Sequence, residues 1–150
     1  MTVAFAPCGT RVATASTDST AMVWSAASGA VELTLAGHAR GLTSLSFSAD
    51  GRRIASGGSD GQVVVWCAAT GAVQRALAAG GLVFSVAWAP DGRSLAAGGF
   101  DHKVRLWDVG DGEMGAAPAR VLEGHTHLVL AVATPPRTKW TRRVPHPVLI

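Results

Sequence analysis

The side chains best suited to catalytic chemistry lie together in one stretch of this sequence, between His38 and Trp66. His38, Ser56 and Asp60 are the three types of a catalytic triad, in which a histidine takes the serine proton and a carboxylate orients the histidine. Ser56, however, lies in an apolar run that predicts a buried strand, and no oxyanion hole is indicated beside it. We therefore expect these residues to have a structural role, and we assign no catalytic residue.

Other chemical sites are as poorly supported. Gly57-Gly58 and Gly98-Gly99 precede turns and not helices, which argues against a phosphate-binding loop. Cys8 and Cys67 form no Cys-x-x-Cys pair and have no histidine at ligand spacing. We expect free thiols, no metal site, no disulfide framework and no cofactor. An enzyme is the least favoured class of function.

The structural elements that position these residues belong to a repeated sequence unit. Three positions recur at intervals of 42 and 41 residues: a tryptophan, an aspartate six residues before it, and an aromatic residue near the start of each unit. They are Trp24, Trp66 and Trp107, then Asp18, Asp60 and Asp101, then Phe5, Phe47 and Trp88. Several registers that share one period indicate a repeat protein.

Each repeat predicts four short strands, because apolar runs of four to six residues alternate with glycine-containing turns. The expected strands are 2–6, 11–15, 21–25 and 30–35 in the first unit, 42–47, 53–57, 62–66 and 72–77 in the second, and 83–88, 94–98, 103–107 and 120–122 in the third. Helix-period patterning is weak throughout, so the expected fold class is all-β.

The repeats resemble the WD40 family of β-propeller blades. The resemblance rests on the Gly-His pairs at Gly37-His38 and Gly124-His125, the close at Val64-Val65-Trp66 and the Trp-Asp pair at Trp107-Asp108. It implies about three four-stranded antiparallel blades plus one strand of a fourth, an incomplete propeller arc. The blades would span about 2–37, 38–79 and 80–124, with the partial fourth at 125–133 and an irregular Pro/Arg-rich tail at 134–150.

The resemblance also implies a hydrogen-bond network. In blades of this family the tryptophan indole bonds a Ser or Thr hydroxyl, the hydroxyl meets the histidine, and the histidine meets the aspartate. These roles fall to Trp66, Ser56, His38 and Asp60. Physical chemistry favours the same pairing, because each unpaired buried polar group costs about 1–3 kcal/mol.

The neighbouring units retain this network only in part. The residues present are Thr14, Asp18 and Trp24 in the first unit, and Asp101 and Trp107 in the third. The first unit has no histidine. In the third, Ala97 takes the place of the serine, and the histidine position falls on Ala79 or Gly80. We expect packing alone to hold the turn of the third unit.

The fourth unit begins with Gly124-His125 and an apolar run over 129–132, and stops resembling a blade at Pro135. The abrupt change of composition underlies the hypothesis that this is a fragment, or a splice or frame variant, of a longer propeller. A closed ring usually needs ~4–8 blades. We therefore expect a larger propeller, an open arc, or self-association that completes the ring.

The positive charge is a property of the tail. Arg137, Lys139, Arg142 and Arg143 have no acid among them, whereas nine basic residues face ten acidic ones in the rest of the chain. Trp140 lies within this cluster, and basic residues around an aromatic one are found in nucleic-acid contacts. Association with RNA or chromatin through the tail is therefore the alternative function. A solvated tail is the favoured interpretation.

The resemblance implies a scaffold that binds other proteins or peptides and assembles complexes. By the same resemblance, the contacts would lie on the face of the Gly-His loops and the aspartate turns. The candidates are Arg40, Thr17, Ser59, Phe100 and His102. Phe100 either packs on its neighbour or serves as an interface anchor. No run approaches the roughly 18 apolar residues of a membrane helix, so we expect an intracellular protein of the cytoplasm or nucleus with no membrane contact.

Overall fold

The computed structural model describes residues 2–110 and 117–134, which form twelve strands and no helix. The first sheet contains β1 (Val3–Phe5), β2 (Arg11–Ala15), β3 (Thr20–Ser25) and β4 (Val31–Ala36). The second sheet contains β5 (Leu42–Phe47), β6 (Arg53–Gly58), β7 (Gln62–Cys67) and β8 (Val73–Ala78). The third sheet contains β9 (Val83–Trp88), β10 (Ser94–Gly99), β11 (Val104–Asp108) and β12 (Arg120–Leu122).

Each sheet is an antiparallel meander whose strands pair in chain order. The predicted fold class is confirmed, and the strands lie within one or two residues of the expected ranges. The agreement has a physical cause. Tight turns with glycine at positive φ, such as Gly51 and Gly92, fix where each hairpin reverses.

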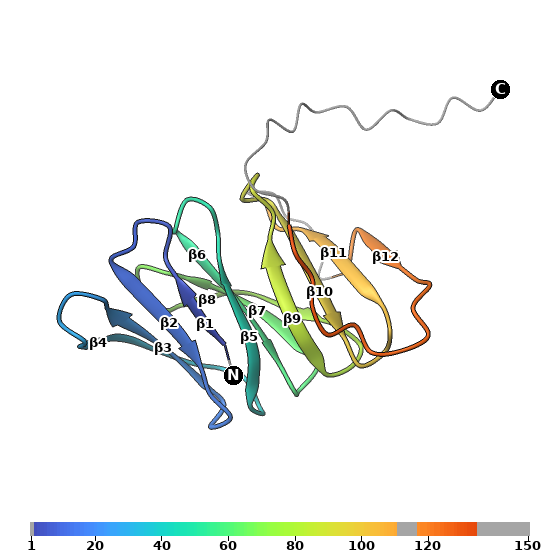
Figure 1. Ribbon diagram of the computed structural model, residues 1–150, viewed down its shortest axis with the longest axis horizontal. Coiled ribbons are helices and arrows are strands. Elements are labelled where there is room, and N and C mark those ends of the chain that lie inside the picture. Colours follow the sequence, from blue (N-terminus) through green and yellow to red (C-terminus); the bar gives the residue numbers. More distant parts are fainter. Residues whose placement is uncertain (1, 111–116, 135–150) are drawn as a thin grey trace.

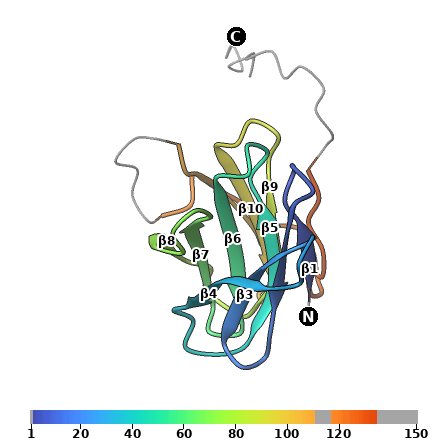
Figure 2. The ribbon, with the colours of Figure 1, turned by 90° about the vertical axis from the view of Figure 1, so that its left-hand side faces the viewer.

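The three sheets stand side by side in an open arc (Figures 1 and 2). The first strand of each sheet faces the next sheet, so that β5 contacts both β1 and β9. The turns that follow β1, β5 and β9 lie at the upper edge of Figure 1, and the aspartate turns that follow β2, β6 and β10 lie at the lower edge. We call these the upper and lower edges of the arc.

Hydroxyl groups join the first strands of neighbouring sheets. Thr43 Oγ1 donates to the carbonyl of Val83 at 2.6 Å, and Ser44 Oγ accepts from the amide of Val86 at 3.1 Å. On the other side, Thr2 Oγ1 donates to the carbonyl of Thr43 at 2.8 Å. These strands pack face to face and not edge to edge, so the hydroxyls satisfy backbone groups that a strand ladder would otherwise pair.

Small residues allow this close approach. A β-carbon at Gly57 would lie 2.5 Å from Val83 Cγ1, and one at Gly98 would lie 2.5 Å from Val129 Cγ1. Both glycines occupy the same register in the second strand of their sheets. The first glycine of each pair therefore makes room for the next unit of the chain.

Two hydrophobic cores lie between the sheets. One joins the first and second sheets and includes Val23, Leu35, Leu45 and Trp66, and the other joins the second and third and includes Val65, Leu77, Leu95 and Trp107. The second sheet contributes to both cores. Each unit is therefore stabilised by its neighbours, as in other repeat proteins.

The strand predicted at 129–132 is not formed. The segment nevertheless lies against β9: the amide of Val132 donates to Ser85 Oγ at 3.1 Å, and Thr134 Oγ1 donates to the carbonyl of Trp88 at 2.7 Å. Val129 is buried, and its amide bonds the carbonyl of Gly99. A strand is defined by its ladder, and the described residues provide no partner strand for this segment.

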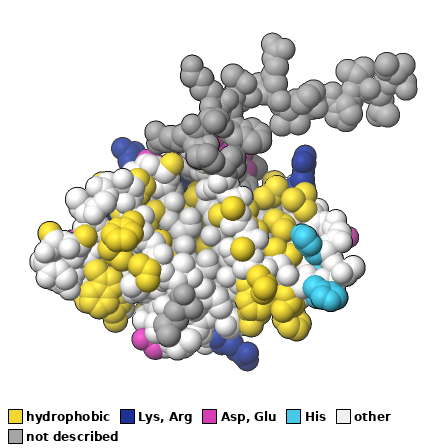
Figure 3. Space-filling view, viewed as in Figure 1, with side chains coloured by type: hydrophobic (Ala, Val, Ile, Leu, Met, Phe, Trp, Pro, Cys, Tyr) yellow, Lys and Arg dark blue, Asp and Glu magenta, His cyan; other side chains and the backbone are white. Residues whose placement is uncertain are grey.

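The two ends of the arc expose apolar side chains. Val3 and Phe5 of β1 are 64% and 66% exposed, and Leu130 is 66% exposed at the other end. The space-filling view shows hydrophobic side chains gathered toward both ends (Figure 3). No helix of the described residues is long and apolar enough to cross a membrane.

Candidate functional site

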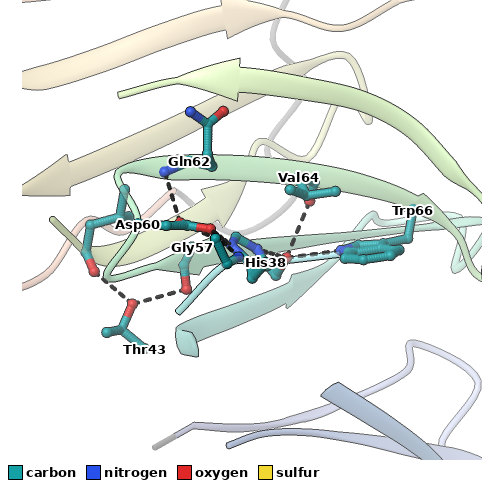
Figure 4. Close-up of polar contacts among 10 residues, drawn as sticks. His38, Thr43, Gly57, Asp60, Gln62, Val64 and Trp66 are labelled. Atoms are coloured by element: carbon teal, nitrogen blue, oxygen red, sulfur yellow. Dashed lines mark hydrogen bonds and ion pairs between the residues drawn. The ribbon is translucent and has the colours of Figure 1, made fainter. Parts of the chain in front are cut away.

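The structure brings His38, Ser56, Asp60 and Trp66 together in the second sheet (Figure 4). Trp66 Nε1 of β7 donates to Ser56 Oγ of β6 at 2.8 Å, and His38 Nε2 lies 2.7 Å from the same oxygen. His38 Nδ1 lies 3.0 and 2.9 Å from the two carboxylate oxygens of Asp60. The loop before β5 and the turn between β6 and β7 are thereby tied to the centre of the sheet.

The carboxylate of Asp60 determines the proton on one ring nitrogen. An ionised carboxylate only accepts, so His38 carries a proton on Nδ1 and donates it to Asp60. Nε2 shares a hydrogen bond with Ser56 Oγ, which accepts from the indole of Trp66 and also lies 3.5 Å from the carbonyl of Val64. Every polar atom in the chain Trp66–Ser56–His38–Asp60 is satisfied in this arrangement, which removes the cost of burying them.

Asp60 is ionised in this setting. Burial acts to raise the pKa of its carboxyl group, but hydrogen bonds from the amides of Ala39 and Gln62 and from His38 outweigh burial and lower the pKa. The two amides lie 2.9 and 3.1 Å from the carboxylate oxygens. Donors directed at a carboxylate favour its charged form.

The spacing of His38, Ser56 and Asp60 matches that of a catalytic triad, but the environment does not. Ser56 is 0% exposed and the side chain of His38 is 0% exposed. The serine oxygen already accepts from Trp66. A nucleophile must reach its substrate, so this geometry supports rigidity of the sheet and not acyl transfer.

The first sheet contains only one link of the network. Trp24 Nε1 donates to Thr14 Oγ1 at 2.9 Å. Asp18 lies apart from this pair and binds the amide and hydroxyl of Thr20 within its own turn. The Thr20 hydroxyl is the main cause of the lowered pKa of Asp18.

The prediction that packing alone holds the aspartate turn of the third sheet is wrong. Arg105 Nη2 of β11 lies 2.6 Å from Asp101 Oδ2, and both side chains are largely buried. The guanidinium occupies space left by Gly80, where a β-carbon would lie 2.6 Å from Arg105 Nη2. The ion pair thus takes the place of the histidine–aspartate contact. A signal was present in the sequence: Arg105 stands in the register of Met22 and Val64.

The tryptophans of the third sheet have no equivalent partner. Ala97 stands at the serine position, and Trp107 Nε1 is buried with no hydrogen bond among the described residues. Trp88 Nε1 is likewise buried and unbonded there. An unpaired buried donor costs about 1–3 kcal/mol. The third sheet therefore contains unsatisfied buried indole donors, whereas the tryptophan of the second sheet is hydrogen-bonded.

Sequence reasoning missed a contact that joins the sheets. Arg11 and Arg53 begin β2 and β6, in the same register. Arg11 Nη1 donates to the carbonyl of Ala68, and Arg53 Nη1 donates to the carbonyl of Val109, each in the next sheet. Arg53 also lies over the ring of Trp88, 4.8 Å from its centroid. The repeated arginine was the available signal.

The candidate contact residues form a row along the lower edge of the arc. Thr17, Ser59 and Phe100 occupy one register in the three aspartate turns. The loop containing Arg40 lies between the first two turns, because the amide of Ser59 donates to the carbonyl of Gly41, and a β-carbon at Gly41 would lie 2.9 Å from Thr17 Cα. We call this set the turn row.

Phe100 and His102 have different settings within the turn row. Phe100 is 58% exposed, although its backbone is held by a 2.8 Å hydrogen bond from its amide to the carbonyl of Leu82. His102 has a φ of 66°, and the same turn position has a φ of 73° at Ser19 in the first sheet and 77° at Gly61 in the second, so a positive φ is common to the three turns. Both cysteines are free, and the described residues contain no group of side chains that could hold a metal ion.

The open arc of four-stranded meanders defines a repeat protein of the propeller class. The family model for the WD40 repeat (WD domain, G-beta repeat) matches residues 1–25, 29–67 and 74–108, which together are more than half of the chain. The chain belongs to this family. The suspected resemblance is thereby confirmed.

Comparison with solved structures shows the same fold. A structure described as that of U3-55K superposes with a TM-score of 0.79 at 21% identity, and the match covers 86% of this chain. The match covers 40% of that chain, so this sequence spans less than half of its length. No curated protein matches the sequence. The comparisons establish fold and family, and they leave the binding partner to be inferred from the surface.

Proposed function

We propose that this protein is a scaffold that binds another protein or a peptide through the turn row, with Phe100 as the central anchor. The exposure of Phe100 carries the proposal. Aromatic side chains are enriched at interface hot spots, where they fill pockets on the partner. Phe100 is 58% exposed on a turn whose backbone is fixed, so the side chain is presented without an ordering cost.

Substitution of Phe100 by alanine tests the proposal. Affinity capture from a cell lysate with the full chain as bait, followed by mass spectrometry, should show specific proteins that the Phe100→Ala variant captures at least about tenfold less, because hot-spot truncations cost ≥2 kcal/mol. The melting temperature should be almost unchanged, since exposed substitutions alter stability by about 0.5 kcal/mol or less.

Val73→Ala is the matched control, because Val73 is 53% exposed and lies outside the turn row. It should capture the same proteins as the wild type. A lower melting temperature for Phe100→Ala with unchanged capture would show that Phe100 packs and does not anchor. Capture that is lost only when residues 135–150 are deleted, and that weakens with salt on an RNA column, would favour the nucleic-acid alternative; the tail lies outside the described residues.

The ends of the arc support completion of the ring by further blades, from a longer chain or from another copy. Phe5 has the register of Phe47 and Trp88, which the preceding sheets cover. Within the described residues no sheet covers the side of β1 that carries Phe5, and Phe5 is 66% exposed there. Light scattering over a range of concentrations should show assembly of this chain; a soluble monomer at every concentration would exclude self-association.

A further inference from the structure

The upper edge of the arc contains a basic hollow that the charge count of the sequence does not reveal. A cavity of about 920 Å³ opens between the second and third sheets, near the turns that follow β5 and β9 (Figure 1). Its charged lining consists of Arg11, Arg52, Arg53, Arg75 and Arg93, with Asp50 and Asp91. The repeats are almost neutral in total, so the fold has sorted cations to this edge.

The arginines of the hollow fall into two groups. Arg11 and Arg53 are committed to carbonyls of the next sheet, and Arg75 is also engaged. Arg52 and Arg93 are exposed, and no hydrogen bond or ion pair of their guanidinium groups is found among the described residues. These two side chains have the same register in neighbouring sheets.

The carboxylates of the hollow form no direct ion pair or hydrogen bond with these two guanidinium groups, although the charges of Arg52 and Arg93 help to lower the pKa of Asp50 and of Asp91. The carboxylate of Asp50 accepts from the Ser48 hydroxyl and the amide of Arg52. That of Asp91 accepts from the amides of Arg93 and Ser94 and from the Ser94 hydroxyl. Both carboxylates therefore complete their own turns, and the guanidinium donors remain available.

The surrounding structure holds the two arginines near each other. Arg53 lies between their turns, over Trp88, and donates to the carbonyl of Gly92 as well as to that of Val109. The guanidinium of Arg93 lies against Gly110, where a β-carbon would be 2.7 Å from Nη2. The turns that carry Arg52 and Arg93 are thus joined by the partly buried guanidinium of Arg53.

We propose that the basic hollow binds an acidic peptide segment of a partner protein, with Arg52 and Arg93 as the carboxylate-binding residues. Guanidinium groups pair with carboxylates through two parallel hydrogen bonds. A cavity of about 920 Å³ suits a few peptide residues. The site lies at the opposite edge from the turn row, so it is a second interaction surface and does not depend on Phe100.

The lining favours a peptide over a nucleic acid. Single-stranded nucleic acids are bound by exposed aromatic side chains that stack on bases, and no aromatic residue is among the described residues that line the hollow. Carboxylates spaced along a peptide can approach the two guanidinium groups individually.

Fluorescence anisotropy with a labelled hexaglutamate peptide tests the proposal on the full chain. The wild type should bind the peptide, and the affinity should fall as salt is added. The double variant Arg52→Glu/Arg93→Glu should bind at least about tenfold more weakly, because two charge-assisted hydrogen-bonding sites are lost. An unchanged thermal unfolding profile verifies that the variant folds.

The matched control is Lys103→Glu/Arg120→Glu, which changes the net charge equally at surface residues that lie outside both the hollow and the turn row. It should bind as the wild type does, and the basic tail is present in both variants. Equal weakening in the two double variants would overturn the proposal in favour of a general charge effect. Competition by a 12-nucleotide oligouridine at equal potency would overturn the choice of a peptide. Phe100→Ala should leave hexaglutamate binding unchanged, so failure here is distinct from failure of the turn-row proposal.

Discussion

The second and third sheets have the same topology, yet they hold their aspartate turns by different chemistry. In the second, His38 joins Asp60 to Ser56 and Trp66 through a chain of hydrogen bonds. In the third, Arg105 pairs directly with the aspartate, and the tryptophan indole has no partner among the described residues. The ladder and the cores therefore suffice for the fold, and the network adds local stability.

The two aspartate contacts also differ in how deeply they are buried. The side chains of His38 and Asp60 are 0% and 9% exposed, whereas those of Arg105 and Asp101 are 15% and 22% exposed. Water can replace part of a lost contact in the third sheet. In the second sheet it cannot, because removal of one group leaves its buried partners unsatisfied.

The largest expected effect is therefore the difference between His38→Ala and Arg105→Ala. Loss of His38 removes the 2.7 Å hydrogen-bond partner of Ser56 Oγ and opens space beside the carboxylate of Asp60, so we expect about 3 kcal/mol of destabilisation. Loss of Arg105 should cost about 1 kcal/mol, because its ion pair is partly solvated. Denaturant unfolding, combined with amide hydrogen exchange of β6–β7 and β10–β11, measures both.

His102→Ala controls for the removal of a histidine from a turn, and it should alter stability little. Exchange should accelerate first in β6 and β7 for His38→Ala. Equal losses for the His38 and Arg105 variants would contradict the view that the hydrogen-bond network holds its sheet more firmly than the ion pair does.

A smaller effect is expected from repair of the third sheet. Ala97→Ser places a hydroxyl where Ser56 stands in the second sheet, and this hydroxyl can accept from Trp107 Nε1. We expect a gain of about 1 kcal/mol, the net worth of one buried hydrogen bond. Thermal unfolding and the indole fluorescence of the variant report the change.

Ala96→Ser is the matched control, since Ala96 is also buried in β10 but alternates to the other face of the sheet. That hydroxyl finds no orphan indole, so the substitution should be neutral or destabilising. If Ala97→Ser also lowers stability, the unpaired indole is not the weakness of this sheet.

Much of the fold was predictable because the signal repeats. Turn glycines and strand alternation recur in three registers, which placed β2, β5, β9 and β12 at their observed bounds. The four network residues could be named because family resemblance supplied their partners, and the structure brings them together. The contacts of Arg105, Arg11 and Arg53 were missed, because each joins residues across sheets or replaces a missing histidine.

The strand expected at 129–132 shows a second limit of sequence reasoning. Its alternation is that of a strand, but a ladder requires a neighbour, and pattern alone does not supply one.

The basic hollow shows a third limit of sequence reasoning. The sum of charges over the repeats is near zero, and only the fold reveals that five arginines face one cavity.

The smallest expected effect is the dependence of the two aspartates' stability contributions on pH and salt concentration. The pKa of Asp101, like that of Asp60, is lowered: burial acts to raise it, and hydrogen bonds from Arg105 and the amide of Lys103, with the charge of Arg105, outweigh burial. A carboxyl group with a lowered folded pKa stabilises the protein above the ordinary value of about 3.9, and this contribution is lost as the pH falls through the folded pKa.

We therefore expect the stability difference between wild type and Asp60→Asn, and that for Asp101→Asn, to be full near pH 7 and to shrink below pH ~4. Salt should separate the two. At about 0.5 M salt, screening should reduce the contribution of Asp101, whose partner is a charged and partly exposed arginine. The contribution of Asp60 should persist, because its partners are two backbone amides and the fully buried side chain of His38, which salt does not reach. Urea titrations at pH 7 and pH 3, with and without salt, measure these differences. Equal salt sensitivity of the two aspartates would mean that both turns are held by the same kind of interaction.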